Sequence, residues 1–175
     1  MDLVHAQPDR QRLKMVIAER LNISPGDRVL DVGCGTGNDV RMLASLVGPT
    51  GWVTGIDLSK TMIDVAHERS RASSLPVSFA LGDARSLDFP DNPFDACRCE
   101  TVLMHLDGSP ARAIAEMARV TRSRGRVVVA DFHWDAGHRP PRATPHPRSC
   151  AHRVRRDPPR LDRWPAAAPD DRCPA

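Results

Sequence analysis

A short apolar run that leads into three alternating glycines constrains the fold of this chain more than any other feature. Residues 28–32 read Arg-Val-Leu-Asp-Val, which is typical of a short buried strand. Glycine follows at positions 33, 35 and 37, and apolar residues at helical spacing continue over 40–47. A strand that passes through a glycine loop into a helix is typical of a parallel α/β fold.

The alternation of strand and helix patterns continues to residue 131. Ser59 is placed to cap one helix, and Ser109-Pro110 to begin another with the proline in its first turn. Strands that alternate with helices predict right-handed crossovers and a Rossmann-like, mostly parallel sheet flanked by helices. The predicted elements are helix 8–22, strand 28–32, helix 40–47, strand 52–56, a helix after 59, strand 77–80, strand 94–99, a helix from 109 and strand 126–130.

Length and composition suit one cytoplasmic domain of ordinary size. The chain has 175 residues, of which 41% are hydrophobic, enough for a globular core. It contains no run of 18 apolar residues, and its first 20 residues lack the pattern of a secretory signal. Five scattered cysteines without disulfide spacing are expected in a reducing compartment.

The last 40 residues differ sharply from the rest. Residues 136–175 hold nine of the 16 prolines and nine arginines, but one valine, one leucine and no isoleucine, phenylalanine or methionine. Such a segment cannot bury enough apolar surface to offset its ordering entropy, so we predict a disordered tail. Its arginines can contact phosphates, yet the lack of lysine and the interrupting prolines and acids disfavour specific nucleic-acid binding.

The predicted organisation is therefore an N-terminal helix and cap over 1–24, a core over 25–135 and the tail over 136–175. Two origins of the tail stay open. It is either a genuine disordered extension or a frame-shifted or otherwise replaced C-terminus, because arginine, proline and alanine dominate it and have GC-rich codons.

The glycine loop is the first candidate binding element. Alternating glycines let the backbone pass close to a ligand, and the free amides of the following helix favour an anionic group. A dinucleotide fingerprint requires glycine where Asn38 stands, and the Gly-Lys-Ser/Thr of a phosphate-binding Walker loop is absent. A tight turn without a ligand is the alternative reading.

Two aspartates at predicted strand ends add to the loop. Asp57 comes 20 residues after Gly37, where a carboxylate can accept hydrogen bonds from both hydroxyls of a ribose. A helix-capping role for Asp57 is less favoured because Ser59 already offers it. Asp83 follows the third strand and can accept a hydrogen bond from an exocyclic amine such as that of adenine, although a turn aspartate is an equally open reading.

Taken together, these segments resemble the class I S-adenosylmethionine-dependent methyltransferases. The resemblance spans residues 25–131, about 60% of the chain. It departs at Ser123-Arg124-Gly125, where the family often has Pro-Gly-Gly, and after Asp135, where the two further strands of the family have no counterpart. The matching stretches are 29–37, 55–59, 82–84, 94–97, 102–106 and 115–120.

The resemblance implies S-adenosyl-L-methionine as cofactor. It places Asp31 near the amino group of the cofactor, Asp57 on the ribose, Leu58 on adenine, and Cys99 and Glu100 at the mouth of the site. The glycine loop would pass beneath the methionine part. The implied cofactor-binding residues are Asp31, Gly33, Cys34, Gly35, Gly37, Asp57, Leu58, Asp83, Ala84, Cys99 and Glu100.

The implied reaction is methyl transfer to a small molecule by in-line attack on the sulfonium methyl, for which a dry, aligned site suffices. His105 is the candidate general base, with a structural histidine as the alternative. Cys97 and Cys99 fall short of a zinc set, so no metal is expected. Quinone-like compounds, polyketides and other natural products are the candidate acceptors, and neither a nucleic-acid nor a membrane partner is expected.

Two other functions stay open. A non-catalytic fragment could keep the cofactor site without a wall for the substrate. An NAD(P)-dependent oxidoreductase is disfavoured by the glycine spacing and by the absence of any tyrosine for a Tyr-x-x-x-Lys pair.

Overall fold

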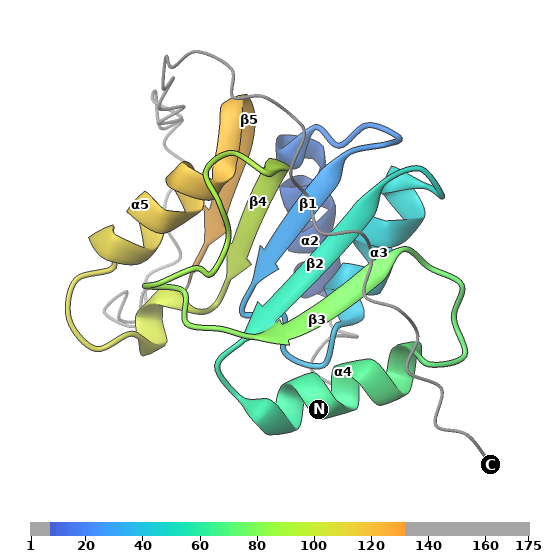
Figure 1. The fold of residues 1–175 in the computed structure, drawn as a ribbon, viewed down its shortest axis with the longest axis horizontal. Coiled ribbons are helices and arrows are strands. Elements are labelled where there is room, and N and C mark those ends of the chain that lie inside the picture. The colour runs from blue at the N-terminus through green and yellow to red at the C-terminus, as the bar shows by residue number, and fades with distance from the viewer. Residues whose placement is uncertain (1–7, 132–175) are drawn as a thin grey trace.

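A five-stranded parallel sheet forms the centre of the computed structural model, which describes residues 8–131. The strand order is β3-β2-β1-β4-β5, and every neighbouring pair runs parallel, so the predicted Rossmann-like sheet is confirmed (Figure 1). In chain order the elements are α2 (Pro8–Leu21), β1 (Arg28–Val32), α3 (Asn38–Val47), β2 (Trp52–Asp57), α4 (Lys60–Ser70), β3 (Val77–Leu81), β4 (Phe94–Glu100), the short 3₁₀ helix η1 (Leu103–His105), α5 (Ala111–Val120) and β5 (Thr121–Ala130).

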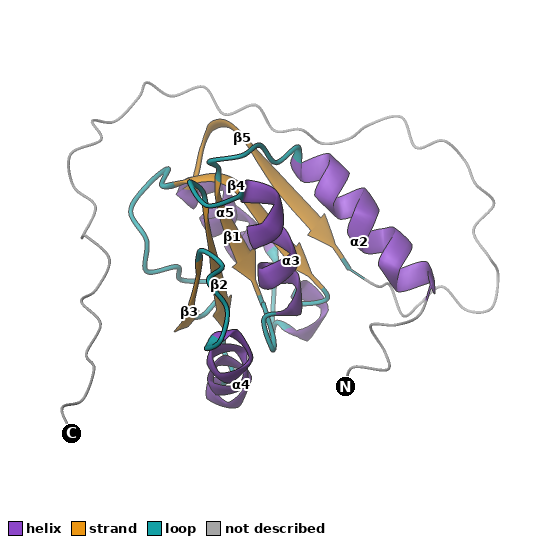
Figure 2. Ribbon diagram, turned by 90° about the vertical axis from the view of Figure 1, so that its right-hand side faces the viewer, coloured by secondary structure: helices purple, strands orange, loops and turns teal. Residues whose placement is uncertain are grey.

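Helices cover both faces of the sheet. Ile17 and Leu21 of α2, Leu43 of α3 and Ile63 of α4 belong to one apolar cluster on the first face. Met117 of α5 belongs to a second cluster on the opposite face, together with side chains of the segment between β3 and β4. Figure 2 shows α2 and α3 on their common side of the sheet. Because all strands are parallel, their carboxyl ends meet at one edge, where α/β proteins bind ligands.

The last strand is longer than the sequence predicted. We expected it to begin at Arg126, but β5 begins at Thr121, directly after α5. Thr121 pairs with Phe94, whereas Arg126 pairs with Ala96, so the residues between them form an irregularity inside the strand. The predicted start of the strand is therefore wrong, because the register shift is absorbed within β5.

Smaller differences concern helix ends. Pro110 occupies the capping position of α5, one residue before the first turn, and Ser109 Oγ accepts a hydrogen bond from the Ala111 amide at 3.2 Å. At α4 the predicted cap is confirmed, since Ser59 Oγ accepts from the Met62 amide at 3.4 Å. Such one-residue shifts are usual at helix ends.

In the part of the chain that the structure describes, β5 is an edge strand, with Val127 and Val129 each 38% exposed. Among helices of residues 8–131, none is long and apolar enough to cross a membrane. The predicted tail over 136–175 lies outside the described residues.

Candidate active site

The three glycines of the loop after β1 have different structural reasons to be glycine. All three have positive φ, +75° at Gly33, +53° at Gly35 and +73° at Gly37. A Cβ at Gly33 would lie 2.1 Å from Val102 Cγ2, and one at Gly37 would lie 2.6 Å from Phe79 Cε1. At Gly35 a Cβ would meet no atom within 4 Å. Two glycines therefore allow close packing, and the third leaves open space beside the backbone.

Hydrogen bonds fasten this loop to the end of β2. The amides of Gly33 and Cys34 donate to the Ile56 carbonyl at 2.8 and 2.9 Å. The Gly35 amide donates to Asp57 Oδ2 at 2.9 Å, and the Ser59 amide donates to Asp57 Oδ1 at 2.8 Å. A carboxylate has about four acceptor positions, so each oxygen of Asp57 keeps one for a further donor.

The end of β3 joins the same edge. The Gly82 amide donates to the Asp57 carbonyl at 3.0 Å, which places Asp83 beside the β2 end. Leu58, next in the chain after Asp57, has 66% of its surface exposed, whereas Ala84 is buried. The glycine loop, Asp57, Leu58 and the Asp83 segment are thus brought together as the sequence predicted.

Asp83 has a partner that the sequence analysis did not foresee. The Arg85 amide donates to Asp83 Oδ1 at 2.8 Å, and Arg85 Nη2 donates to Oδ2 at 2.8 Å. These hydrogen bonds from Arg85 lower the pKa of Asp83. The carboxylate is therefore ionised and held in a fixed direction.

A buried charge cluster lies behind the glycine loop and consists of Lys14, Asp31, Asp39, Arg98 and Glu100. Arg98 is only 1% exposed. Its Nε lies 3.5 Å from Asp31 Oδ1, its Nη1 lies 3.1 Å from Asp39 Oδ2, and its Nη2 bonds Glu100. Lys14 of α2 also pairs with Asp39. A charge this deep in a protein persists only when it is paired.

The pKa values in the buried charge cluster follow from burial and pairing. Burial raises the pKa of Asp31 to about 7, although Arg98 opposes the shift. At Asp39 burial acts in the same direction, but Arg98 and Lys14 outweigh it and the pKa is lowered. Two cations face three carboxylates, and since Asp31 is only partly ionised at neutral pH, the net charge of the cluster lies between zero and minus one.

Cys99, near the end of β4, differs from its predicted place at the mouth of the site. Cys99 is buried in the apolar cluster beneath α5, which raises the pKa of its thiol to about 12, so its side chain does not face an open mouth. Thr101 has a φ of +58°, and its buried Oγ1 has no hydrogen-bond partner within the described residues. Strained, non-glycine backbone of this kind clusters at functional sites, and no sequence signal marks it.

His105 closes the short helix η1 and is exposed. Asp131 Oδ2 accepts a hydrogen bond from the Met104 amide at 3.0 Å, which ties η1 to the end of β5. Val102, three residues earlier, is the side chain packed against Gly33. Within residues 8–131 no three His, Cys, Asp or Glu side chains are grouped so as to hold a metal ion.

Comparison with known proteins agrees with this geometry. Residues 29–125 match the family model of the methyltransferase domain. The chain belongs to this methyltransferase family. S-adenosylmethionine is the cofactor of the family. The ubiquinone/menaquinone biosynthesis C-methyltransferase of Burkholderia cenocepacia is 37% identical over 136 residues, which cover 77% of this chain and 55% of that protein.

Two solved structures show the same fold. The methyltransferase domain superposes on an S-adenosylmethionine-dependent methyltransferase from Aquifex aeolicus with a TM-score of 0.65 and 25% identity, covering 77% of this chain and 73% of the other. A cyclase named SpnF gives a TM-score of 0.63 and 37% identity, covering 69% and 44%. The chain spans only 35% to 55% of the length of the first curated relatives.

Proposed function

We propose that this methyltransferase domain binds S-adenosylmethionine along the ends of β1, β2 and β3 and transfers its methyl group to a small-molecule acceptor. One observation carries the proposal. The Gly35 amide is fixed on Asp57 while the space over Gly35 is open, so a ligand can pass over the loop and reach the carboxylate.

The surrounding residues fit the parts of this cofactor. The two remaining acceptor positions of Asp57 suit the two ribose hydroxyls. The exposed side chain of Leu58 offers an apolar surface for adenine, and Asp83 an ionised acceptor for its amine. The buried charge cluster carries no excess positive charge, and its carboxylates, among them Asp31 and Glu100, favour the cationic amino group and sulfonium.

Bound cofactor supplies an electrophilic methyl group on a positively charged sulfur. The residues of this chain then have two tasks, alignment of the methyl group with the acceptor and exclusion of water. We propose that His105, exposed on η1, takes a proton from an acceptor hydroxyl. Relatives named as quinone methyltransferases support a quinone-like acceptor, with polyketides and other natural products as further options.

A second candidate function is cofactor binding without methyl transfer. The 37% identity with a structure named as a cyclase favours it, because that level of similarity includes a protein named for another reaction.

Binding and turnover separate these functions. Calorimetry should show binding of S-adenosylhomocysteine and none of NAD, and methyl transfer from labelled cofactor should then be measured with a panel of reduced quinones and phenolic acceptors. Binding with turnover supports the proposal, and binding without turnover supports the second candidate. We expect His105→Ala to keep cofactor affinity and lose turnover, whereas retention of both would leave the residue without a catalytic role.

A further inference from the structure

The segment between β3 and β4 has little structure of its own. Residues 82–93 contain a single isolated bridge, between Asp83 and Ser86, and no helix. Yet this segment carries Asp83, the acceptor proposed for the adenine amine. Its conformation must therefore be set by contacts from other elements.

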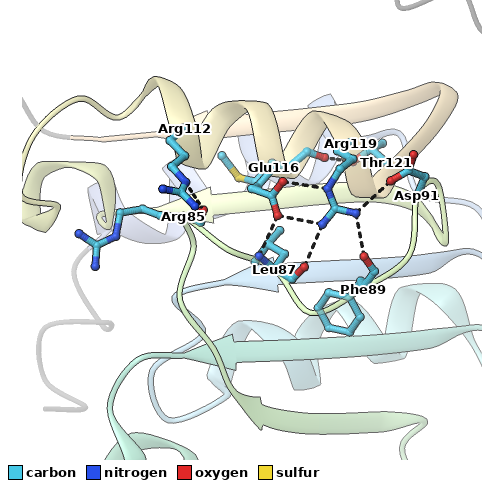
Figure 3. Close-up of polar contacts among 9 residues, drawn as sticks. Arg85, Leu87, Phe89, Asp91, Arg112, Glu116, Arg119 and Thr121 are labelled. Carbon is cyan, nitrogen blue, oxygen red and sulfur yellow. Dashed lines mark hydrogen bonds and ion pairs between the residues drawn. The ribbon is translucent and has the colours of Figure 1, made fainter.

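Arg119 of α5 provides most of these contacts (Figure 3). Its Nη2 donates to the Leu87 carbonyl at 2.8 Å, and its Nη1 donates to the Phe89 carbonyl at 2.7 Å and to Asp91 Oδ1 at 3.0 Å. Nε and Nη2 also donate to the two oxygens of Glu116, each at 2.8 Å. These five bonds match the five donors of a guanidinium, so the group is fully used.

Glu116 completes the arrangement on the same helix. Its Oε2 accepts a hydrogen bond from the Leu87 amide at 2.8 Å, so the amide and the carbonyl of Leu87 are both held. The bonds from Arg119 lower the pKa of Glu116 to about 2, and the carboxylate stays ionised at neutral pH. We call Glu116 and Arg119 the α5 clamp.

A third residue of α5, Arg112, holds the main chain between the clamp contacts and Asp83. Arg112 Nε donates to the Arg85 carbonyl at 2.8 Å, and Arg85 is the residue that holds the Asp83 carboxylate. Ala84 and Leu87 are buried beneath α5 in the same apolar cluster as Met117. These contacts hold the main chain of residues 84–91 along α5. We expect the direction of the Asp83 carboxylate to depend on that conformation, because Asp83 immediately precedes it in the chain.

We infer that Glu116 and Arg119 are positioning residues for adenine recognition. The inference rests on the proposed cofactor site. The clamp lies at the surface, with the Arg119 side chain 32% exposed, while buried Met117 and Val120 anchor α5 to the sheet. Loss of the clamp should therefore leave the fold in place and release the segment that carries Asp83.

Discrimination between two ligands tests this. S-inosylhomocysteine carries an oxygen in place of the 6-amino group of adenine, so it cannot donate to Asp83 from that position. By calorimetry we expect the wild-type protein to bind S-adenosylhomocysteine at least about tenfold more tightly than this analogue, as is usual when a polar group loses its partner. In Arg119→Lys, which keeps the charge but has three donors and no planar fork, this ratio should fall toward one.

Controls separate positioning from a general loss of stability. Arg122→Lys alters an ion pair of β5 with Asp95 that does not touch the segment, and it should keep the wild-type ratio. In Asp83→Asn the ratio should also fall, and adding Arg119→Lys should lower it no further, because both changes act on one contact. Glu116→Gln, which keeps the shape of the side chain, provides the test if the Arg119 variant does not fold.

The outcomes are distinct. A wild-type protein that binds neither ligand overturns the proposed cofactor site itself. A wild-type protein that discriminates while Arg119→Lys and Glu116→Gln discriminate equally well, even with a lower melting temperature, overturns the positioning role and leaves the clamp as a structural feature.

Discussion

The two halves of the strand-end edge are held in different ways. At β1, β2 and β3 the glycine loop and Asp57 are fixed by hydrogen bonds from backbone amides to nearby strand ends, such as that from Gly35 to Asp57. At β4 and the segment before it, two arginines do this work, Arg98 of β4 in the interior and Arg119 of α5 at the surface. The first half relies on backbone amides and the single carboxylate of Asp57, whereas the second half depends on charges that must stay paired.

Arg98→Met breaks the second half and should have the largest effect. It leaves Asp31, Asp39 and Glu100 with Lys14 as their cation within the buried charge cluster. Removing one partner of a buried ion pair typically costs about 3–5 kcal/mol, and we expect a loss of this size in urea unfolding.

A paired change sharpens this result. Adding Asp31→Asn to Arg98→Met removes one of the unpaired carboxylates and should restore part of the stability. A loss below about 1 kcal/mol in the single variant, the range of exposed ion pairs, would show that the cluster is not held together by Arg98.

Substitutions in the glycine loop address the first half. Gly37→Ala places a Cβ 2.6 Å from the Phe79 ring at a positive φ, and strain and overpacking together should lower the free energy of unfolding by about 2–4 kcal/mol.

The added Cβ of Gly35→Ala meets no atom within 4 Å, so this variant should lose only the free energy of the backbone strain, about 1–2 kcal/mol. By calorimetry Gly35→Ala should nevertheless lose affinity for S-adenosylhomocysteine, since its methyl group fills the space over the loop. Unchanged affinity would mean that the ligand does not pass there.

The pH dependence of the α5 clamp should give the smallest effect. The pKa of Glu116 is lowered from 4.5 to about 2 in the folded protein, chiefly by hydrogen bonds from Arg119. A lowered pKa stabilises the fold above pH 4.5, and this contribution disappears as the pH falls from 4.5 toward 2. Glu116→Gln should lack this contribution, so its melting temperature should fall less between pH 5 and pH 3 than that of the wild-type protein. Parallel curves would contradict the shift.

This contrast also explains what the sequence could predict. The strands, the glycine loop, Asp57 and the cap at Ser59 are local patterns, and the structure contains each of them. Arg98 looks like a charged residue in a strand with Glu100 two residues away, and nothing in its neighbourhood in the sequence announces its other partners, Asp31 of β1 and Asp39 of α3. The register shift in β5 likewise depends on three-dimensional contacts, which residue spacing does not encode, whereas the pairing of Asp83 with Arg85 spans only two residues and is local.

Binding of S-adenosylhomocysteine to Asp57→Ala tests the central claim most directly. Asp57 links the glycine loop to the ends of β2 and β3, and its free acceptor positions are the proposed ribose site. By calorimetry we expect the wild-type domain to bind and the variant to lose about 1–3 kcal/mol of binding free energy, the cost of unpaired polar groups. Equal affinity in the two proteins, with both folded, would remove Asp57 from the site and contradict the account.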